Sequence, residues 1–284
     1  MGKFSELLFA CDFDHTLSGY DDSVPAANLE AIHYFTDNGG LFSVASGRSM
    51  RLLRSRVAQL PVNAPCLCFN GAACYDYRTQ ELLYAHPLPD LAPEILAAAF
   101  RFDAAVGAEI QTLDGHYPYG DCEARNAFLR SQSIEPAYVD GLPPLPWMKL
   151  VFTMPAGGLF STETPNATPP AVAQYMKQLT AALQPICGGT CYLVRSMPRL
   201  LEIGAVGFNK GDSARELARR LGRSTLVCAG DAPNDAQMLA AADYAFAPSD
   251  CDPEITHIPG LRQTVPCAEG AVAAAIAQLD KLLV

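Results

Sequence analysis

The chain has 284 residues, of which 50% are hydrophobic and 18% are charged, a composition that fits globular domains and excludes a disordered polypeptide. This length allows one large domain or two modest ones. The formal net charge of −10 argues against a nucleic-acid-binding protein, because contacts with the phosphate backbone need a basic surface.

The first third of the chain alternates apolar runs with helix-like segments. Strands are predicted at 7–11, 41–45 and 66–69, and helices at 25–38 and 49–59. This alternation is typical of βαβ units with a parallel sheet that is covered on both faces. The run 7–11 is too short for a signal peptide or a membrane-spanning helix, so we expect a cytoplasmic protein that does not enter the membrane.

The same alternation returns in the last third, with helices predicted at 210–221, 235–241 and 270–283 and strands at 225–229 and 244–247. The middle differs, because strand candidates at 148–154 and 191–194 and helices at 90–102 and 169–183 are separated by long turns rich in proline. The sequence therefore predicts a doubly wound, Rossmann-like parallel-sheet core from residues 1–86 and 204–284. Residues 87–203 would form an inserted α+β unit.

Ten cysteines are present, but no two of them form a CxxC pair. Half of them lie in or beside apolar runs that are predicted to be strands. Buried thiols of this kind behave as small hydrophobic side chains. We therefore expect reduced cysteines and a reducing compartment.

Acidic residues follow the first predicted strand in the stretch Asp12-Phe13-Asp14-His15-Thr16-Leu17. Asp12 and Asp14 are two residues apart, so in extended chain they face the same way. The carboxyl ends of strands form the ligand crevice of a doubly wound sheet. A turn in which Asp14 caps together with Thr16 would also account for this stretch.

A second acidic cluster, Gly230-Asp231-Ala232-Pro233-Asn234-Asp235, follows the strand predicted at 225–229. A turn followed by a helix cap explains Asn234 or Asp235 adequately. It does not explain why acidic groups stand at the ends of two strands. Oxygen ligands at such a crevice suit Mg²⁺, which takes a few carboxylates and leaves positions for water and phosphate.

Two further segments are candidates for binding an anion. Ser46-Gly47-Arg48 follows the second predicted strand, where a hydroxyl and helix-terminal N–H groups can hold phosphate oxygens. Lys210 opens a helix, a position that the helix dipole disfavours for a cation. Taken alone, each has a simpler explanation, a helix cap for the first and a solvated surface lysine for the second. The Walker spacing GxxxxGK[ST] is absent from both segments.

In this order, the four segments resemble the motifs of the haloacid dehalogenase superfamily. The long insertion after the third strand is similar to the cap of its Cof-type branch, which has a type IIB cap. Asn70-Gly71-Ala72, Met238-Leu239 and Glu269-Gly270 match this branch as well. The resemblance covers the predicted core, residues 1–86 and 204–284, well. The insertion, residues 87–203, matches only in its length and in its general pattern of strands, helices and long turns.

The resemblance implies a phosphoric monoester hydrolase that forms an aspartyl-phosphate. Asp12 would be the nucleophile and Asp14 the general acid and base. Mg²⁺ would be held by Asp12, Asp14 and Asp231, with Asp235 anchoring the site from nearby. The transferring phosphoryl group would be bound by Ser46, Gly47, Asn70, Lys210 and Asn234.

His15 is a departure from the family, which usually has glycine at this position. Either the imidazole points away from the site, or it adds a ligand contact or a group that titrates near neutral pH. We leave His15 out of the predicted catalytic set.

The inserted unit would select the substrate, and the family implies a sugar phosphate or another small phosphorylated metabolite. A phosphohexomutase that uses the same intermediate is one alternative, and a phospho-ligand sensor without turnover is another. The sensor would not need Asp14. The sequence does not define the oligomeric state.

Overall fold

The computed structural model describes residues 2–120, 122–155 and 168–283. The chain divides into two compact units, one formed by Met1–Tyr84 with Phe208–Val284 and the other by Ala85–Gly207. The sequence analysis placed these divisions at 86/87 and 203/204.

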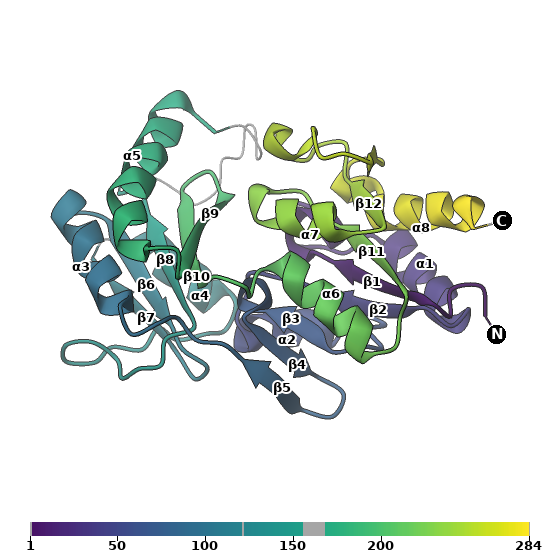
Figure 1. The fold of residues 1–284 in the computed structure, drawn as a ribbon, viewed down its shortest axis with the longest axis horizontal. Helices are drawn as coiled ribbons and strands as arrows, with labels where there is room; N and C mark the ends of the chain where they lie inside the picture. The colour runs from purple at the N-terminus through teal and green to yellow at the C-terminus, as the bar shows by residue number, and fades with distance from the viewer. Residues whose placement is uncertain (1, 121, 156–167, 284) are drawn as a thin grey trace. The chain divides into compact units, whose positions relative to one another are not determined.

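The first unit is built on a five-stranded parallel sheet in the order β13-β12-β11-β1-β2 (Figure 1). Its strands are β1 (Leu7–Cys11), β2 (Leu41–Val44), β11 (Thr225–Ala229), β12 (Tyr244–Ala247) and β13 (Leu261–Gln263). The central strand β1 is apolar throughout and buried along its whole length, as expected for a strand that is covered on both faces. The predicted doubly wound α/β fold is confirmed.

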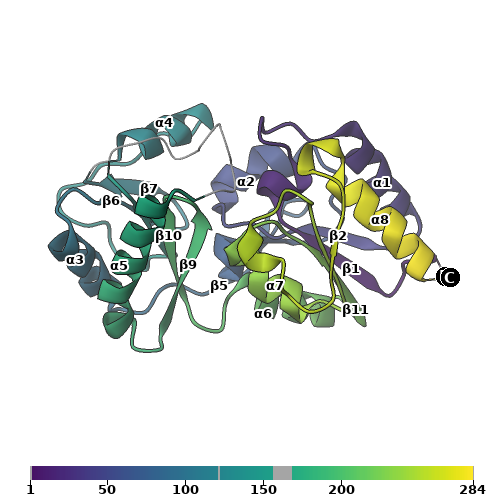
Figure 2. The ribbon, with the colours of Figure 1, turned by 90° about the horizontal axis from the view of Figure 1, so that it is seen from above.

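Helices cover both faces of this sheet (Figure 2). The helices α1 (Ala26–Asp37) and α8 (Ala271–Leu282) pack together on one face, where Phe35 contacts Phe9 of β1. The helices α6 (Lys210–Arg220) and α7 (Ala236–Ala241) cover the other face and share a core with Leu8 and Ala10. Alternate side chains of β1 therefore enter two different hydrophobic cores.

The third predicted strand, β3 (Cys66–Cys68), joins the parallel sheet through a single bridge, between Ala45 and Leu67. Its main partner is antiparallel, in a three-stranded sheet with β4 (Ala73–Asp76) and β5 (Glu81–Ala85). The sequence analysis missed β4 and β5. Their connecting turn contains no glycine, proline or asparagine, which are the usual turn signals.

The second unit has a five-stranded sheet in the order β7-β6-β8-β10-β9, in which all neighbouring strands are antiparallel. Its elements are α3 (Ala92–Phe102), β6 (Gly107–Gln111), β7 (His116–Tyr119), α4 (Glu123–Ser131), β8 (Lys149–Thr153), α5 (Pro170–Cys187), β9 (Cys191–Met197) and β10 (Leu200–Ala205). The helices α3 and α5 pack on one face of this sheet and α4 packs on the other. The predicted α+β character of the insertion is therefore present.

All ten cysteines are free and buried, as expected. The reducing compartment that the sequence analysis drew from them stays a prediction, and so does the cytoplasmic location drawn from the short run 7–11. Within the described part of the chain, no helix is long and apolar enough to cross a lipid bilayer.

Candidate active site

The order in which the chain adds strands to the parallel sheet reverses between β1 and β11. These strands are neighbours in register, with Cys11 opposite Ala229, and the N–H of Asp12 donates to the carbonyl of Ala229 at 2.9 Å. From β1 the chain proceeds to β2 on one side, whereas β11 leads to β12 on the other. Ligands of doubly wound sheets bind at the carboxyl ends of the strands at such a switch point. The two acidic clusters of the sequence begin there.

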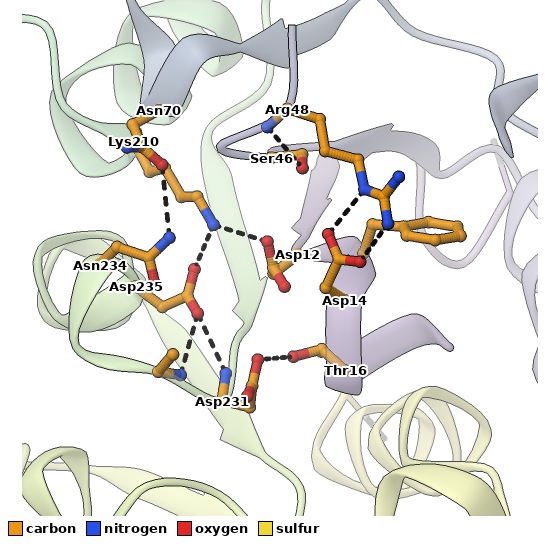
Figure 3. A network of polar contacts seen from close by, with 12 residues as sticks. Asp12, Asp14, Thr16, Ser46, Arg48, Asn70, Lys210, Asp231, Asn234 and Asp235 are labelled. Atoms are coloured by element: carbon orange, nitrogen blue, oxygen red, sulfur yellow. Dashed lines mark hydrogen bonds and ion pairs between the residues drawn. The ribbon is translucent and has the colours of Figure 1, made fainter. Parts of the chain in front are cut away.

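Asp12 and Asp231 follow these two strands, and their side chains are buried. Lys210, the first residue of α6, is fully buried between the acidic groups (Figure 3). Its ammonium group donates to Asp12 Oδ1 at 2.6 Å and to Asp235 Oδ1 at 2.7 Å. The simpler sequence explanation, a solvated surface lysine, is therefore wrong.

Asp235 holds the second acidic loop in place. Its Oδ2 accepts the N–H groups of Asp231 and Ala232, each at 3.1 Å, while its Oδ1 binds Lys210. Gly230 permits this approach, since a Cβ on it would lie 2.5 Å from the Cβ of Asp235. A side chain at 230 would push Asp235 away from the loop.

Three carboxylates thus lie close together with one ammonium group, which contacts two of them, so an excess of negative charge remains. Burial, opposed by Lys210 and reinforced by Asp235, raises the pKa of Asp12 to about 8. Burial and the neighbouring Asp12 raise the pKa of Asp231 well above its ordinary value. A buried cluster of this kind favours either protons or a cation.

The donor set fits Mg²⁺. One oxygen from each of Asp12, Asp231 and Asp235 lies within 4.8 Å of the others, and all are hard carboxylate ligands. Because Asp235 already binds Lys210 and two backbone N–H groups, Asp12 and Asp231 are the better direct ligands. The predicted division between the direct ligands and Asp235 as a nearby anchor stays a prediction.

The stability of the protein in EDTA is expected to fall as the pH rises from about 4 to about 8. The pKa of Asp12 is raised in the folded state from 3.8 to about 8, so the folded protein binds more protons than the unfolded chain in this window. Saturating Mg²⁺ should remove most of this slope, because the ion replaces the protons.

Urea denaturation at several pH values, with EDTA or Mg²⁺, measures both effects. Asp231→Asn is the matched variant and should reduce the slope and the response to Mg²⁺ together. Identical slopes with EDTA and Mg²⁺ would contradict a cation site at these carboxylates.

Asp14 lies apart from this cluster and faces Arg48 (Figure 3). The guanidinium group of Arg48 binds both carboxylate oxygens, Nε to Oδ2 at 2.9 Å and Nη2 to Oδ1 at 2.6 Å. Burial alone would raise the pKa of Asp14, but Arg48 outweighs it and lowers the pKa to about 2. Asp14 does not cap a turn with Thr16, whose hydroxyl instead donates to Asp231 Oδ1 at 3.0 Å.

The other predicted phosphate-binding residues lie around the same strand ends. Ser46 is buried, and its hydroxyl accepts the N–H of Arg48 at 3.1 Å, with Gly47 between them. Asn70 is also buried, and its side-chain oxygen accepts a hydrogen bond from the amide of Asn234 at 3.3 Å. The structure thus brings together polar groups from four distant segments, and their binding roles stay predictions.

His15 has a φ of 60°, in the left-handed region that favours glycine. This explains why glycine suits the position. The imidazole lies against Tyr20, with ring centroids 4.6 Å apart, and burial lowers its pKa. Arg48 and Thr16 are the contacts that the sequence analysis missed, although both residues stand inside the motifs that it identified.

A family model described as haloacid dehalogenase-like hydrolase matches residues 9–140 and 169–276. Two curated relatives named HMP-PP phosphatase, from Yersinia enterocolitica and Serratia proteamaculans, are each 25% identical over 94% of this chain and 92% of their own length.

Solved structures share the fold. A haloacid dehalogenase-like hydrolase from Bacteroides thetaiotaomicron has a TM-score of 0.77 at 18% identity, covering 96% of this chain and 98% of its own. A sugar phosphatase of haloacid dehalogenase subclass IIB has a TM-score of 0.74 at 17% identity, covering 98% and 100%.

Proposed function

This chain belongs to the family of haloacid dehalogenase-like hydrolases and is a phosphoric monoester hydrolase, and from this premise we propose the following reaction. The protein is a Mg²⁺-dependent phosphatase that hydrolyses a small phosphorylated metabolite through an aspartyl-phosphate on Asp12. The observation that carries this is the buried Asp12 carboxylate at the switch point of the sheet, 2.6 Å from the ammonium group of Lys210.

In the first step, a carboxylate oxygen of Asp12 attacks phosphorus and the bond to the leaving oxygen breaks. Arg48 holds Asp14 ionised in this structure, so Asp14 first takes up a proton from solvent and then donates it to that oxygen, and the product leaves as an alcohol. In the second step, Asp14 removes a proton from water while the water oxygen attacks the aspartyl-phosphate. Inorganic phosphate leaves, and Asp12 is restored as a carboxylate.

The attacking carboxylate and the phosphate dianion would repel each other without compensation. Lys210 supplies one positive charge in contact with Asp12. Ser46, Gly47, Asn70 and Asn234 supply polar groups for the transferring phosphoryl oxygens. These residues come from separate strand ends, so they can surround one tetrahedral group.

Asp12, Asp231 and the backbone carbonyl of Asp14 would hold Mg²⁺, with Asp235 keeping the loop of Asp231 in place. When bound, the ion neutralises charge that develops on the phosphoryl oxygens. Asp235 also fixes the ammonium group of Lys210 beside Asp12.

A sugar phosphate or a similar small phosphomonoester is the substrate class that we propose. The relatives named HMP-PP phosphatase and the subclass IIB sugar phosphatase support small phosphorylated molecules. The acidic net charge of −10 supports a small ligand rather than a nucleic acid. The inserted unit, Ala85–Gly207, is the proposed cap that selects among such substrates.

Release of inorganic phosphate from 4-nitrophenyl phosphate and from a panel of phosphorylated sugars and other metabolites tests the function. We expect turnover with Mg²⁺, loss of turnover in EDTA, and recovery when Mg²⁺ is added back. Binding without phosphate release would instead indicate a sensor. Interconversion of hexose phosphates that requires a sugar bisphosphate would indicate a mutase.

A further inference from the structure

Asp14 and three other charged side chains form a network within the first unit. Arg48 binds both oxygens of Asp14 at 2.9 and 2.6 Å. The same Nη2 atom lies 3.6 Å from Oδ1 of Asp22. Asp22 is held from its other side, since its Oδ2 accepts from Arg56 Nη2 at 2.6 Å. Two arginines and two aspartates thus balance in charge.

The contact between Arg48 and Asp14 conflicts with the role proposed for Asp14. A carboxylate whose two oxygens both accept guanidinium N–H groups is fixed in orientation and cannot turn toward a leaving alcohol while that contact lasts. The side chain of Arg48 is 7% exposed, so it cannot simply move into solvent without losing its packing. Arg48 therefore needs a second anionic partner close by when Asp14 acts.

We propose that Asp22 is this partner, and that Arg48 and Asp22 are a positioning pair for Asp14. Arg48 transfers from Asp14 to Asp22 when substrate is bound, and the Asp14 carboxyl group then turns to the leaving oxygen. This inference rests on the proposed phosphatase reaction. No bond is made or broken in the transfer, and the buried guanidinium group keeps a carboxylate partner throughout.

The local geometry suits such a transfer. The guanidinium groups of Arg48 and Arg56 lie 5.6 and 5.8 Å from the centroid of the Phe13 ring, so both cations lie beside the same aromatic side chain. The turn that carries Asp22 is closed by a hydrogen bond from the N–H of Asp22 to the carbonyl of Gly19 at 3.1 Å. Arg56 binds Oδ2 and leaves Oδ1 on the side of Arg48.

Replacing Asp22 with Asn removes the receiving charge with little disturbance of the fold. The side chain of Asp22 is 41% exposed, and asparagine tolerates its φ of 66°. Arg48 should then remain on Asp14, and protonation of the leaving group should fail. Asp21→Asn is the matched control, because Asp21 is exposed in the same turn and its Oδ1 accepts from Ser23, a contact that an amide oxygen preserves.

The leaving-group dependence of kcat/KM separates this role from a structural one, since kcat/KM ends with phosphoryl transfer to Asp12. Phenolate is a poor leaving group that needs protonation, whereas 4-nitrophenolate leaves readily without it. General acid catalysis contributes about 10²–10⁴-fold. For Asp22→Asn we expect kcat/KM to fall about tenfold or more with phenyl phosphate, which is a modest part of the full contribution of general acid catalysis. With 4-nitrophenyl phosphate we expect kcat/KM to fall less than about twofold.

Asp14→Asn should show the same pattern more strongly, and the double variant with Asp22→Asn should be no worse than Asp14→Asn alone. Equal losses on both esters, unchanged kcat/KM in Asp22→Asn, or an equal effect of Asp21→Asn would overturn the positioning role while the proposed function stands. A wild-type protein that hydrolyses neither ester would instead overturn the proposed function and this inference with it.

Discussion

Replacing Asp12 with Ala is expected to abolish phosphate release with Mg²⁺ present. Removal of a catalytic nucleophile costs up to about 10⁶-fold in kcat, and we expect a loss of at least about 10⁴-fold here. The variant lacks the oxygen that would attack phosphorus and a proposed ligand of the ion. Single-turnover assays with 4-nitrophenyl phosphate at high enzyme concentration measure the loss down to the background rate.

The same substitution should leave the fold intact. It removes one of three clustered carboxylates, and Lys210 keeps its contact with Asp235 at 2.7 Å. We therefore expect the free energy of unfolding to change by less than about 2 kcal/mol. Asp37→Ala, at an exposed position at the end of α1, is the control and should keep full activity. Substantial turnover by the Asp12 variant would show that another group attacks phosphorus.

Replacing Lys210 with Met is expected to impair both activity and stability. Lys210 is fully buried and contacts Asp12 and Asp235, so its removal leaves clustered carboxylates without their shared cation. Breaking a buried ion pair by removing one partner costs about 3–5 kcal/mol. Loss of a charge that stabilises the transferring phosphoryl group should also lower kcat/KM by about 10²-fold or more.

The carboxylates near Lys210 determine how the destabilisation by Lys210→Met depends on pH. Lys210 lowers the pKa of Asp12, so its loss raises that pKa further and makes the cluster bind protons at higher pH. In EDTA the destabilisation should therefore be larger at pH 8 than at pH 5, where Asp12 is protonated. Urea denaturation at the two pH values tests this, with Lys281→Met on the exposed part of α8 as the control. A Lys210 variant as stable as the wild type at pH 8 would contradict the buried contact.

Continuous apolar runs made the core of the fold predictable. The strands predicted at 225–229 and 244–247 agree with β11 and β12, because strands buried on both faces consist of uninterrupted apolar residues. The acidic residues after β1 and β11 were predictable for a related reason. Charged groups that end a buried strand carry a desolvation cost, which marks them as candidates for a site.

Two of the strands that the sequence analysis missed in the second unit, β6 and β10, carry buried charges. β6 contains Glu109 and β10 contains Glu202, both buried, which interrupt the alternation that marks a strand. Their partners come from elsewhere in the chain. Arg125 of α4 pairs with Glu109, and Lys149 of β8 donates to Glu202 at 2.9 Å. Only the folded sheet brings these charges together, so local patterns could not reveal them.

The sequence by itself determined which residue types stand at the ends of β1 and β11, because hydrophobic runs and the acidic residues that follow them are local features. The tertiary structure decided which partners those residues take. Lys210 reaches Asp12 across 198 positions, and Asp14 binds Arg48, 34 positions away. These contacts depend on the strand order that places β1 beside both β2 and β11. Charged groups pair when they lie a few ångströms apart in space. The number of positions between two residues along the chain does not predict which groups will meet in this way.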